Sequence, residues 1–278
     1  MRSLRALGFF LACQLFNTAL YAENYDALIA QIKAQNPDSE ISTLGNDKST
    51  AYFAISTQAP LAPSKGTVVL IHDQGEHADW PDVIRPLRLL LIRSGWNTLS
   101  IQFPTIAGKP GSQTRTETLD QRYISDLQAL IATQNSDKLI LMVHGDNNLL
   151  LTNALTAPLA NLAAYVAISA TEPQDKEANP LLTNLLKLNV PLLDLYAQRD
   201  FPWVISAANR RLQRIKKQMQ TNLGQQATTT SSSNIKYQQL IIPVADHWFI
   251  GQEEVLAKRV AGWLSNNAQF VKQGTVTK

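Results

Sequence analysis

The chain has 278 residues, of which 45% are hydrophobic and 17% are charged, and its formal net charge at pH 7 is +3. This is the composition of an ordinary globular protein with enough apolar residues for one large core. So small a net charge gives no broad basic surface, and we therefore expect no nucleic-acid partner.

The first 22 residues have the layout of a secretory signal peptide. Arg2 and Arg5 form a short basic region, an apolar run follows from Ala6 to Leu20, and the small residue Ala22 stands at the expected cleavage site. The run is too short to span a bilayer comfortably, so we expect no stable membrane span after cleavage. Two less favoured interpretations are a lipoprotein signal that ends at Cys13 and an uncleaved anchor.

Cleavage after Ala22 would also remove Cys13, which is the only cysteine of the chain. Export without disulfides suits a bacterial periplasm, where a core of this size is stable on its own. We therefore predict a periplasmic or secreted protein with a single domain over residues 23–278.

The first elements after the signal are a short amphipathic helix over residues 24–35 and two strands over 41–44 and 51–56. From Gly66 onward, strands and helices alternate. The predicted strands cover residues 67–71, 96–103, 139–143, 164–169, 191–197 and 235–242. The predicted helices cover residues 81–93, 119–132, 149–155, 181–188, 203–219 and 251–264. Residues 107–116 and 224–234 are interpreted as loops.

This alternation predicts an α/β fold with one mostly parallel central sheet. Several of the strands, such as TVVLI at residues 67–71, are continuous apolar runs, which is typical of strands buried on both faces. Helices on both sides of the sheet would give a three-layer sandwich.

Polar residues follow four of the predicted strands. In open α/β sheets, functional sites form beyond the carboxyl ends of the strands. Three of the four histidines of the chain fall in these positions. The four segments are His72-Asp73-Gln74-Gly75, His144-Gly145-Asp146, Gln198-Arg199-Asp200 and Asp246-His247-Trp248.

The order of turn, acid and histidine along the chain resembles the α/β-hydrolase superfamily, whose nucleophile elbow reads G-x-S-x-G. The stretch GTVVLIHDQGEHADWPDVIRPLRLLLIRSGWNTLSIQFP, at residues 66–104, also resembles an uncharacterised exported bacterial family of that superfamily, known by a domain-of-unknown-function label. The resemblance covers residues 66–264 and implies the three-layer fold of the superfamily.

The resemblance also implies roles for the polar segments. The segment His72-Asp73-Gln74-Gly75 matches an H-G-x-G oxyanion loop, with Asp73 in place of the first glycine. Asp200 matches the catalytic acid and His247 the catalytic histidine. His144 and Trp248, which flank the elbow and the histidine, are candidates for lining a pocket.

The elbow itself departs from the superfamily at three positions. Val143 stands for the first glycine, Gly145 for the nucleophilic serine and Asn147 for the last glycine. An elbow holds its central residue in a left-handed conformation that glycine adopts at little cost, so Gly145 preserves the turn and deletes the hydroxyl. Without a nucleophile, a histidine base has nothing to activate.

We therefore predict a degenerate hydrolase that keeps a pocket for a small-molecule or protein ligand. The alternative is an active hydrolase of ester or related bonds, with Asp146 as a carboxylate nucleophile or with a relocated serine such as Ser169. The favoured interpretation of Asp146 is a helix N-cap, which Asp commonly provides. No metal-binding spacing joins His144 and His247 to Asp73 or Asp200, so we expect neither a metal nor another cofactor.

Two further features suggest structural roles. Asp194 lies inside the apolar segment PLLDLYA, where a buried carboxylate requires hydrogen-bonding partners. The predicted helix over residues 203–219 carries a run of basic side chains that we expect to face solvent, although an interaction protein is a third functional hypothesis. These basic residues are Arg210, Arg211, Arg214, Lys216 and Lys217.

Overall fold

The computed structural model describes residues 26–44, 52–103, 121–134, 136–155, 159–173, 180–225 and 236–268. The predicted signal peptide, the predicted loop at 107–116 and all but the first two residues of the predicted loop at 224–234 lie outside these ranges. None of the described helices combines the length and the apolar character that a bilayer crossing needs.

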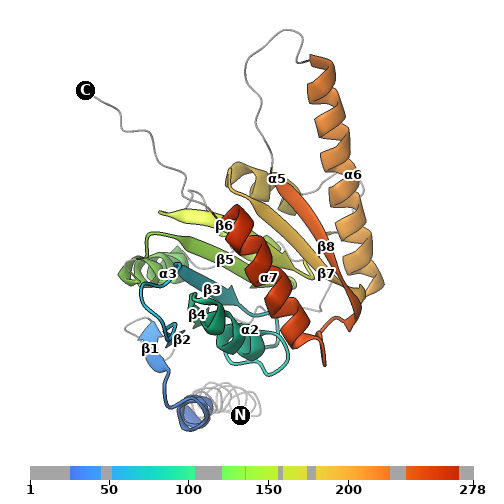
Figure 1. Cartoon of the computed structure of the whole chain (residues 1–278). Coiled ribbons are helices and arrows are strands. Elements are labelled where there is room, and N and C mark those ends of the chain that lie inside the picture. Colours follow the sequence, from blue (N-terminus) through green and yellow to red (C-terminus); the bar gives the residue numbers. More distant parts are fainter. Residues whose placement is uncertain are drawn as a thin grey trace, which may run out of the picture.

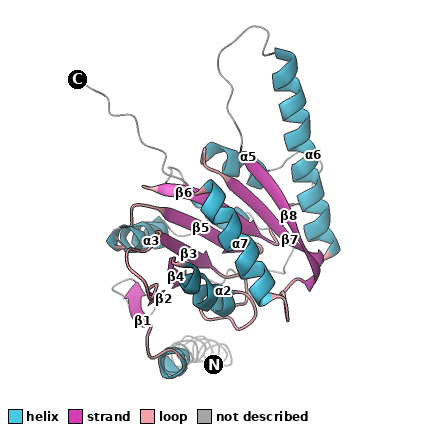
Figure 2. Ribbon diagram, in the orientation of Figure 1, coloured by secondary structure: helices cyan, strands magenta, loops and turns pink. Residues whose placement is uncertain are grey.

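The centre of the molecule is an open eight-stranded sheet with the order β1-β2-β4-β3-β5-β6-β7-β8, drawn in magenta in Figure 2. β1 and β2 are antiparallel to each other, and β2 is antiparallel to β4, whereas all remaining pairs are parallel. The strands are β1 (Glu40–Leu44), β2 (Tyr52–Thr57), β3 (Thr67–Ile71), β4 (Asn97–Ile101), β5 (Leu139–His144), β6 (Leu162–Ile168), β7 (Leu192–Arg199) and β8 (Tyr237–Asp246).

Helices cover both faces of the sheet, which confirms the predicted α/β three-layer sandwich. α2 (Ile84–Leu91) and α7 (Glu253–Asn267) lie side by side on one face, in front of the strands in Figure 1. The opposite face packs against α3 (Gln121–Thr133), α4 (Asn147–Ala154), α5 (Pro180–Lys187) and α6 (Pro202–Gln225). A helix over residues 26–35 and a short 3-10 helix, η1 (Ile92–Ser94), complete the described helices.

The element boundaries show where sequence patterns are informative. β3 has the predicted bounds, and all five of its residues are buried, as expected of a strand covered on both faces. Gly95 has φ 87°, in the left-handed region that glycine adopts readily, and is the C-cap of η1. β8 runs four residues beyond its predicted end and passes through Pro243, which an edge strand tolerates because its outer amide groups need no partner.

A buried ion pair joins α6 to β7, and it corrects one expectation. The guanidinium of Arg211 is fully buried and donates two hydrogen bonds of 2.9 Å to the carboxylate of Asp194. Tyr237 donates a third hydrogen bond to this carboxylate, at 2.5 Å. Asp194 thus has the buried partners that it requires. The expectation that the whole basic run faces solvent is wrong for Arg211, because the side of α6 that carries it packs on the sheet.

Replacement of Arg211 by alanine should lower the free energy of unfolding by about 3–5 kcal/mol, because it leaves the Asp194 carboxylate buried without its counter-charge. The exposed Lys216 on the same helix supplies the control, and Lys216→Ala should change stability by less than about 0.5 kcal/mol. Urea unfolding followed by circular dichroism measures both. Equal midpoints for the two variants would contradict this account of the pair.

Candidate active site

Asp200 and His247 meet at the carboxyl ends of β7 and β8. Asp200 follows β7 directly and His247 follows β8 directly, and the two strands are neighbours. The Nδ1 atom of His247 lies 2.7 Å from Oδ1 of Asp200. The other carboxylate oxygen of Asp200 accepts a hydrogen bond of 2.5 Å from the hydroxyl of Ser169. The acid therefore holds the imidazole in one orientation, as in an acid–histidine pair of a catalytic triad.

The turn after β5 has the geometry of a nucleophile elbow. Gly145 has φ 61°, in the left-handed region, and its amide donates a hydrogen bond of 2.9 Å to the carbonyl of Ile168 on β6. The side-chain amide of Asn148 donates to the carbonyls of Val143 and Gly145, each at 2.9 Å. The turn is thus fixed on both sides, with glycine at its centre.

The carboxylate of Asp73 occupies the space in which a serine side chain would stand. A Cβ atom built on Gly145 would lie 1.9 Å from Cγ of Asp73 and 2.0 Å from its Oδ2. Real Cβ atoms do not approach other heavy atoms so closely, so residue 145 can carry a side chain only if Asp73 moves away.

The same carboxylate binds the two amides that form an oxyanion hole in this fold. In α/β hydrolases these are the amide of the residue after the nucleophile and an amide of the loop after β3. Here Oδ1 of Asp73 accepts hydrogen bonds from the amides of Asp146 and Gln74, each at 2.7 Å. Its Oδ2 lies 3.6 Å from Nε2 of His247. Asp73 therefore replaces both the serine side chain and the anion that the hole would stabilise.

The contacts among Asp200, His247 and Asp73 determine the protonation states of His247 and Asp73. Burial alone lowers the pKa of His247, but the hydrogen bond to Asp200 and the nearby Asp73 carboxylate outweigh burial and raise the pKa to about 9. Burial raises the pKa of Asp73, but His247, the charge of His144 and the two amides outweigh burial, so the pKa of Asp73 is lowered. At neutral pH, Asp73 is a carboxylate and His247 an imidazolium.

A second acid–histidine pair lies beside Asp73. Nδ1 of His144 is 3.2 Å from Oε2 of Glu76, and this oxygen also accepts a hydrogen bond of 2.9 Å from the Asp73 amide. Burial lowers the pKa of His144, but the charge and hydrogen bond of Glu76 outweigh it, and the pKa is raised. The rings of His144 and His247 are 5.1 Å apart. Sequence reasoning missed Glu76, although its position three residues after Asp73 places it in the same loop.

His72 and Asn147 have structural roles in the described contacts. Nε2 of His72 accepts a hydrogen bond of 2.8 Å from the amide of Phe103, and its Nδ1 lies 2.6 Å from the carbonyl of Asp73. Burial lowers the pKa of His72 to about 4, so the ring is neutral and donates from Nδ1. Asn147 donates a hydrogen bond of 2.6 Å to the carbonyl of His72 and also accepts one from the side chain of Gln74. The loop after β3 is thereby tied to the elbow.

The remaining predicted site residues lie at the edge of the site. Gly75 has φ 82° and shapes the turn of the β3 loop. Trp248 lies edge-on to His247, with ring centroids 5.5 Å apart, and is 38% exposed. Phe201 contacts both rings, with its centroid 4.5 Å from that of His247. One side of the imidazole therefore has an aromatic wall.

The two alternative nucleophiles have other contacts. Asp146 is the N-cap residue of α4 by position, and its carboxylate accepts a hydrogen bond from Thr171 without capping the helix. Ser169 is fully buried, and its hydroxyl donates to Asp200. Its φ of 47° is unusual for a serine, a strained conformation of the kind that occurs at functional sites. Nε2 of His247, the atom that would activate a nucleophile, faces the carboxylate of Asp73 instead.

Two other observations concern ligand sites. Among the described residues, no group of three or more His, Cys, Asp or Glu side chains is arranged to hold a metal ion.

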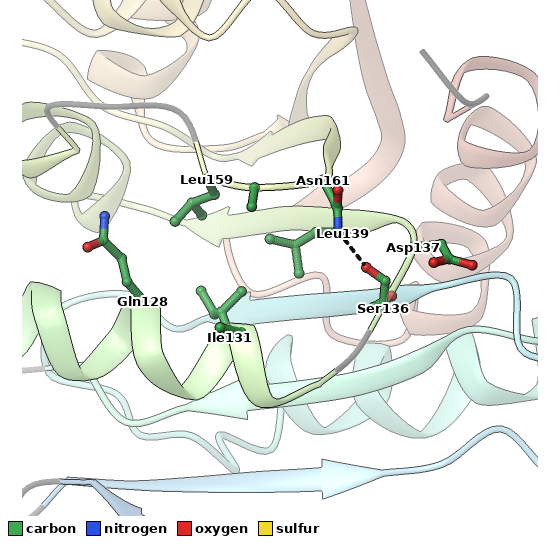
Figure 3. A pocket seen from close by; sticks show the side chains of 9 residues that line it. Gln128, Ile131, Ser136, Asp137, Leu139, Leu159 and Asn161 are labelled. Carbon is green, nitrogen blue, oxygen red and sulfur yellow. Dashed lines mark hydrogen bonds between the residues drawn. The ribbon is translucent and has the colours of Figure 1, made fainter. Parts of the chain in front are cut away.

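A hollow of about 460 Å³ lies at the start of β5, lined in part by Gln128, Leu139 and Asn161 (Figure 3). It is at the opposite end of β5 from His144, so it is separate from the acid–histidine site.

Solved structures with a similar fold are α/β hydrolases. The dienelactone hydrolase of Anabaena variabilis superposes with a TM-score of 0.58 at 15% identity, covering 83% of this chain and 98% of that one. An esterase of Pyrococcus furiosus gives 0.58 at 16% identity, with coverages of 83% and 92%. An α/β serine hydrolase homologue of Coxiella burnetii gives 0.56 at 13% identity, with coverages of 81% and 97%. At these identities the similarity shows the fold, and this chain has the α/β-hydrolase fold.

Sequence comparison points to an uncharacterised family. Residues 20–126 match the family model described as "Protein of unknown function (DUF3530)". This agrees with the expected resemblance to an uncharacterised α/β-hydrolase-like family. No curated protein matches the chain in sequence.

The raised pKa of His247 predicts a loss of stability at alkaline pH. Its pKa is about 9 in the folded protein and 6.5 for the unperturbed side chain, so its contribution is complete below pH 6.5 and is lost as the pH rises through 9. The loss should be on the order of 3 kcal/mol. His247→Gln should remove most of this dependence in urea unfolding measured across the range. His77→Gln is the control, since the pKa of His77 is lowered, and a slope unchanged in His247→Gln would refute the assignment.

Proposed function

We propose that this protein is a degenerate serine hydrolase that binds a small ligand at the Asp73–His247 site. The observation that supports this proposal is the Asp73 carboxylate, which lies where a serine side chain would stand and binds both amides of the oxyanion hole. An ester in this site would find no serine to attack its carbonyl carbon. The oxyanion of a tetrahedral intermediate would also find no vacant hole to stabilise it.

A binding role is supported by what the site retains. The Asp200–His247 pair is intact, the side chain of Asp73 is 18% exposed, and that of His247 is 7% exposed. Phe201 packs against the imidazole, Trp203 stacks on Phe201, and Trp248 lies edge-on to both Phe201 and His247. Together these rings provide an apolar surface. A small organic ligand suits this apolar surface beside the polar Asp73–His247 pair.

Hydrolysis by Asp146 or Ser169 has less support. The Ser169 hydroxyl donates to Asp200, so it orients the acid, and the Asp146 carboxylate contacts Thr171. The hypothesis that a protein partner binds the basic residues of α6 also has less support, because one of these residues, Arg211, is buried.

We also propose that the protein is exported to the periplasm or secreted. The support is the basic region, apolar run and small residue within the first 22 residues. N-terminal sequencing of the protein recovered from the periplasmic fraction should begin at Glu23. Recovery of the protein in the cytoplasm with Arg2 still present would refute export.

The proposal predicts which substitutions rebuild a serine hydrolase. Gly145→Ser alone should yield no esterase activity, because its side chain meets the Asp73 carboxylate. The double variant Asp73→Gly with Gly145→Ser clears this space and frees the two amides. It should hydrolyse short p-nitrophenyl esters and react with a fluorophosphonate probe, and adding His247→Gln should lower the rate by about 100-fold or more.

The matched control combines Gly145→Ser with Glu254→Gln, which removes an exposed carboxylate on α7 and leaves Asp73 in place. This control should remain inactive. Fluorophosphonate labelling of the unmodified protein would refute the proposal that serine chemistry is lost. Equal esterase activity in Gly145→Ser alone would show that Asp73 does not block the site.

A further inference from the structure

The hollow at the start of β5 lies at the end of the sheet opposite the acid–histidine site. Its volume of about 460 Å³ is within the range of pockets that hold small molecules. Its walls come from α3, from the segments that precede β5 and β6, and from the first residue of β5 (Figure 3). The hollow is therefore a candidate ligand site that shares no residue with the Asp73–His247 site.

The floor of the hollow is apolar. Ile131 of α3, Leu139 of β5 and Leu159 are buried, with exposed fractions of 8%, 2% and 8%, and their side chains gather in the middle of Figure 3. Residues three and four apart share one side of a helix, so Gln128, Ile131 and Ala132 lie together on α3 and line the same wall. An alkyl chain laid across this floor would leave water and contact three buried side chains.

Hydrogen bonds hold one end of the hollow in place. The side-chain amide of Asn161 donates a hydrogen bond of 3.2 Å to the carbonyl of Ser136, drawn as a dashed line in Figure 3. The hydroxyl of Ser136 donates to the carbonyl of Lys138 at 2.7 Å, and the amide of Leu139 donates to the carbonyl of Asn161 at 2.9 Å. These bonds join the segments before β5 and β6, so this end of the hollow is formed before any ligand binds.

Two polar side chains of the hollow have unused hydrogen-bonding capacity. The exposed carboxylate of Asp137 makes no hydrogen bond or ion pair with the residues that the structure describes, and the side-chain amide of Gln128 makes none within the same ranges. The two residues stand at opposite ends of the hollow in Figure 3. Of the described residues that line the hollow, Asp137 carries the one formal charge, and the neighbouring Lys138 does not line it. The hollow thus combines an apolar floor with a negative charge at one end.

We propose that this hollow binds an aliphatic ammonium ion, with the alkyl chain on the apolar floor and the charged nitrogen beside Asp137. A carboxylate and an ammonium group form charge-assisted hydrogen bonds, which are stronger than those between neutral groups. An alkyl carboxylate would instead place a second negative charge beside Asp137. A cation without a chain would leave the floor in contact with water. This site is separate from the Asp73–His247 site and does not depend on the function proposed there.

Octylammonium chloride, titrated into the purified protein below its micelle concentration, tests this site. In ¹H–¹⁵N spectra, the amide signals of Ile131, Leu139 and Asn161 should move in a saturable, one-to-one manner, and those of Asp73 and His247 should stay in place. Each CH₂ group removed from the chain should weaken binding about two- to fourfold, because less apolar surface leaves water. Octanoate and 1-octanol should bind about fivefold more weakly or less.

Two pairs of variants separate the charge from the floor. Asp137→Asn should weaken octylammonium binding about fivefold or more. Its control is Asp38→Asn, which removes an exposed carboxylate outside the hollow and should bind as wild type. Ala132→Trp places a large side chain over the floor and should weaken binding about tenfold or more. Its control, Ala129→Trp, changes an exposed residue of α3 that does not line the hollow and should bind as wild type.

The absence of saturable octylammonium binding to wild type would overturn the site. Octanoate or 1-octanol that binds as tightly as octylammonium would overturn the selection of a cation, and equal affinities of Asp137→Asn and Asp38→Asn would overturn the role of the carboxylate. Signal changes confined to the loops around His247 would place the ligand at the other site and overturn this one. The loss of serine chemistry is tested separately by the p-nitrophenyl ester variants, so failure here leaves that proposal unaffected.

Discussion

The hydrogen bonds from two backbone amides to the Asp73 carboxylate are the interaction on which the site depends. They hold a negative charge at the elbow turn, just before helix α4. Two backbone amides of the fold converge at this position and favour an anion there. The charge of Asp73 in turn helps to keep His247 protonated, and its volume requires a residue without a side chain at position 145. Asp73 and Gly145 therefore depend on each other, because the carboxylate can take this position only when residue 145 has no side chain.

Carboxylates and imidazoles alternate around the site and form one network. Asp200, His247, Asp73, His144 and Glu76 follow one another, with each imidazole next to a carboxylate. Buried ions are costly unless they are paired, and removal of one member leaves its neighbour uncompensated. The network also joins the loops after β3, β5, β7 and β8. The chain thus maintains an energetically demanding arrangement, which is more consistent with a functional site than with a relic of lost catalysis.

The fold was predictable from the sequence because its strands are continuous apolar runs, as in β3, and its helices follow in strict alternation. The positions of Asp200 and His247 followed from their order along the chain. The role of Asp73 did not, since a match to the oxyanion loop places its backbone and not the direction of its carboxylate. The burial of Arg211 was missed because neighbouring basic residues on α6 look alike in sequence, although the lone carboxylate of Asp194 in an apolar strand indicated a buried partner.

The most direct test of the central claim is the proton chemical shift of the Gln74 and Asp146 amides, compared between wild type and Asp73→Ala. Amides that donate to a carboxylate at 2.7 Å form strong, charge-assisted hydrogen bonds. Both signals should therefore lie far downfield in wild type and move upfield together in the variant. Amide signals that stay in place when the carboxylate is removed would contradict the position of Asp73 at the elbow.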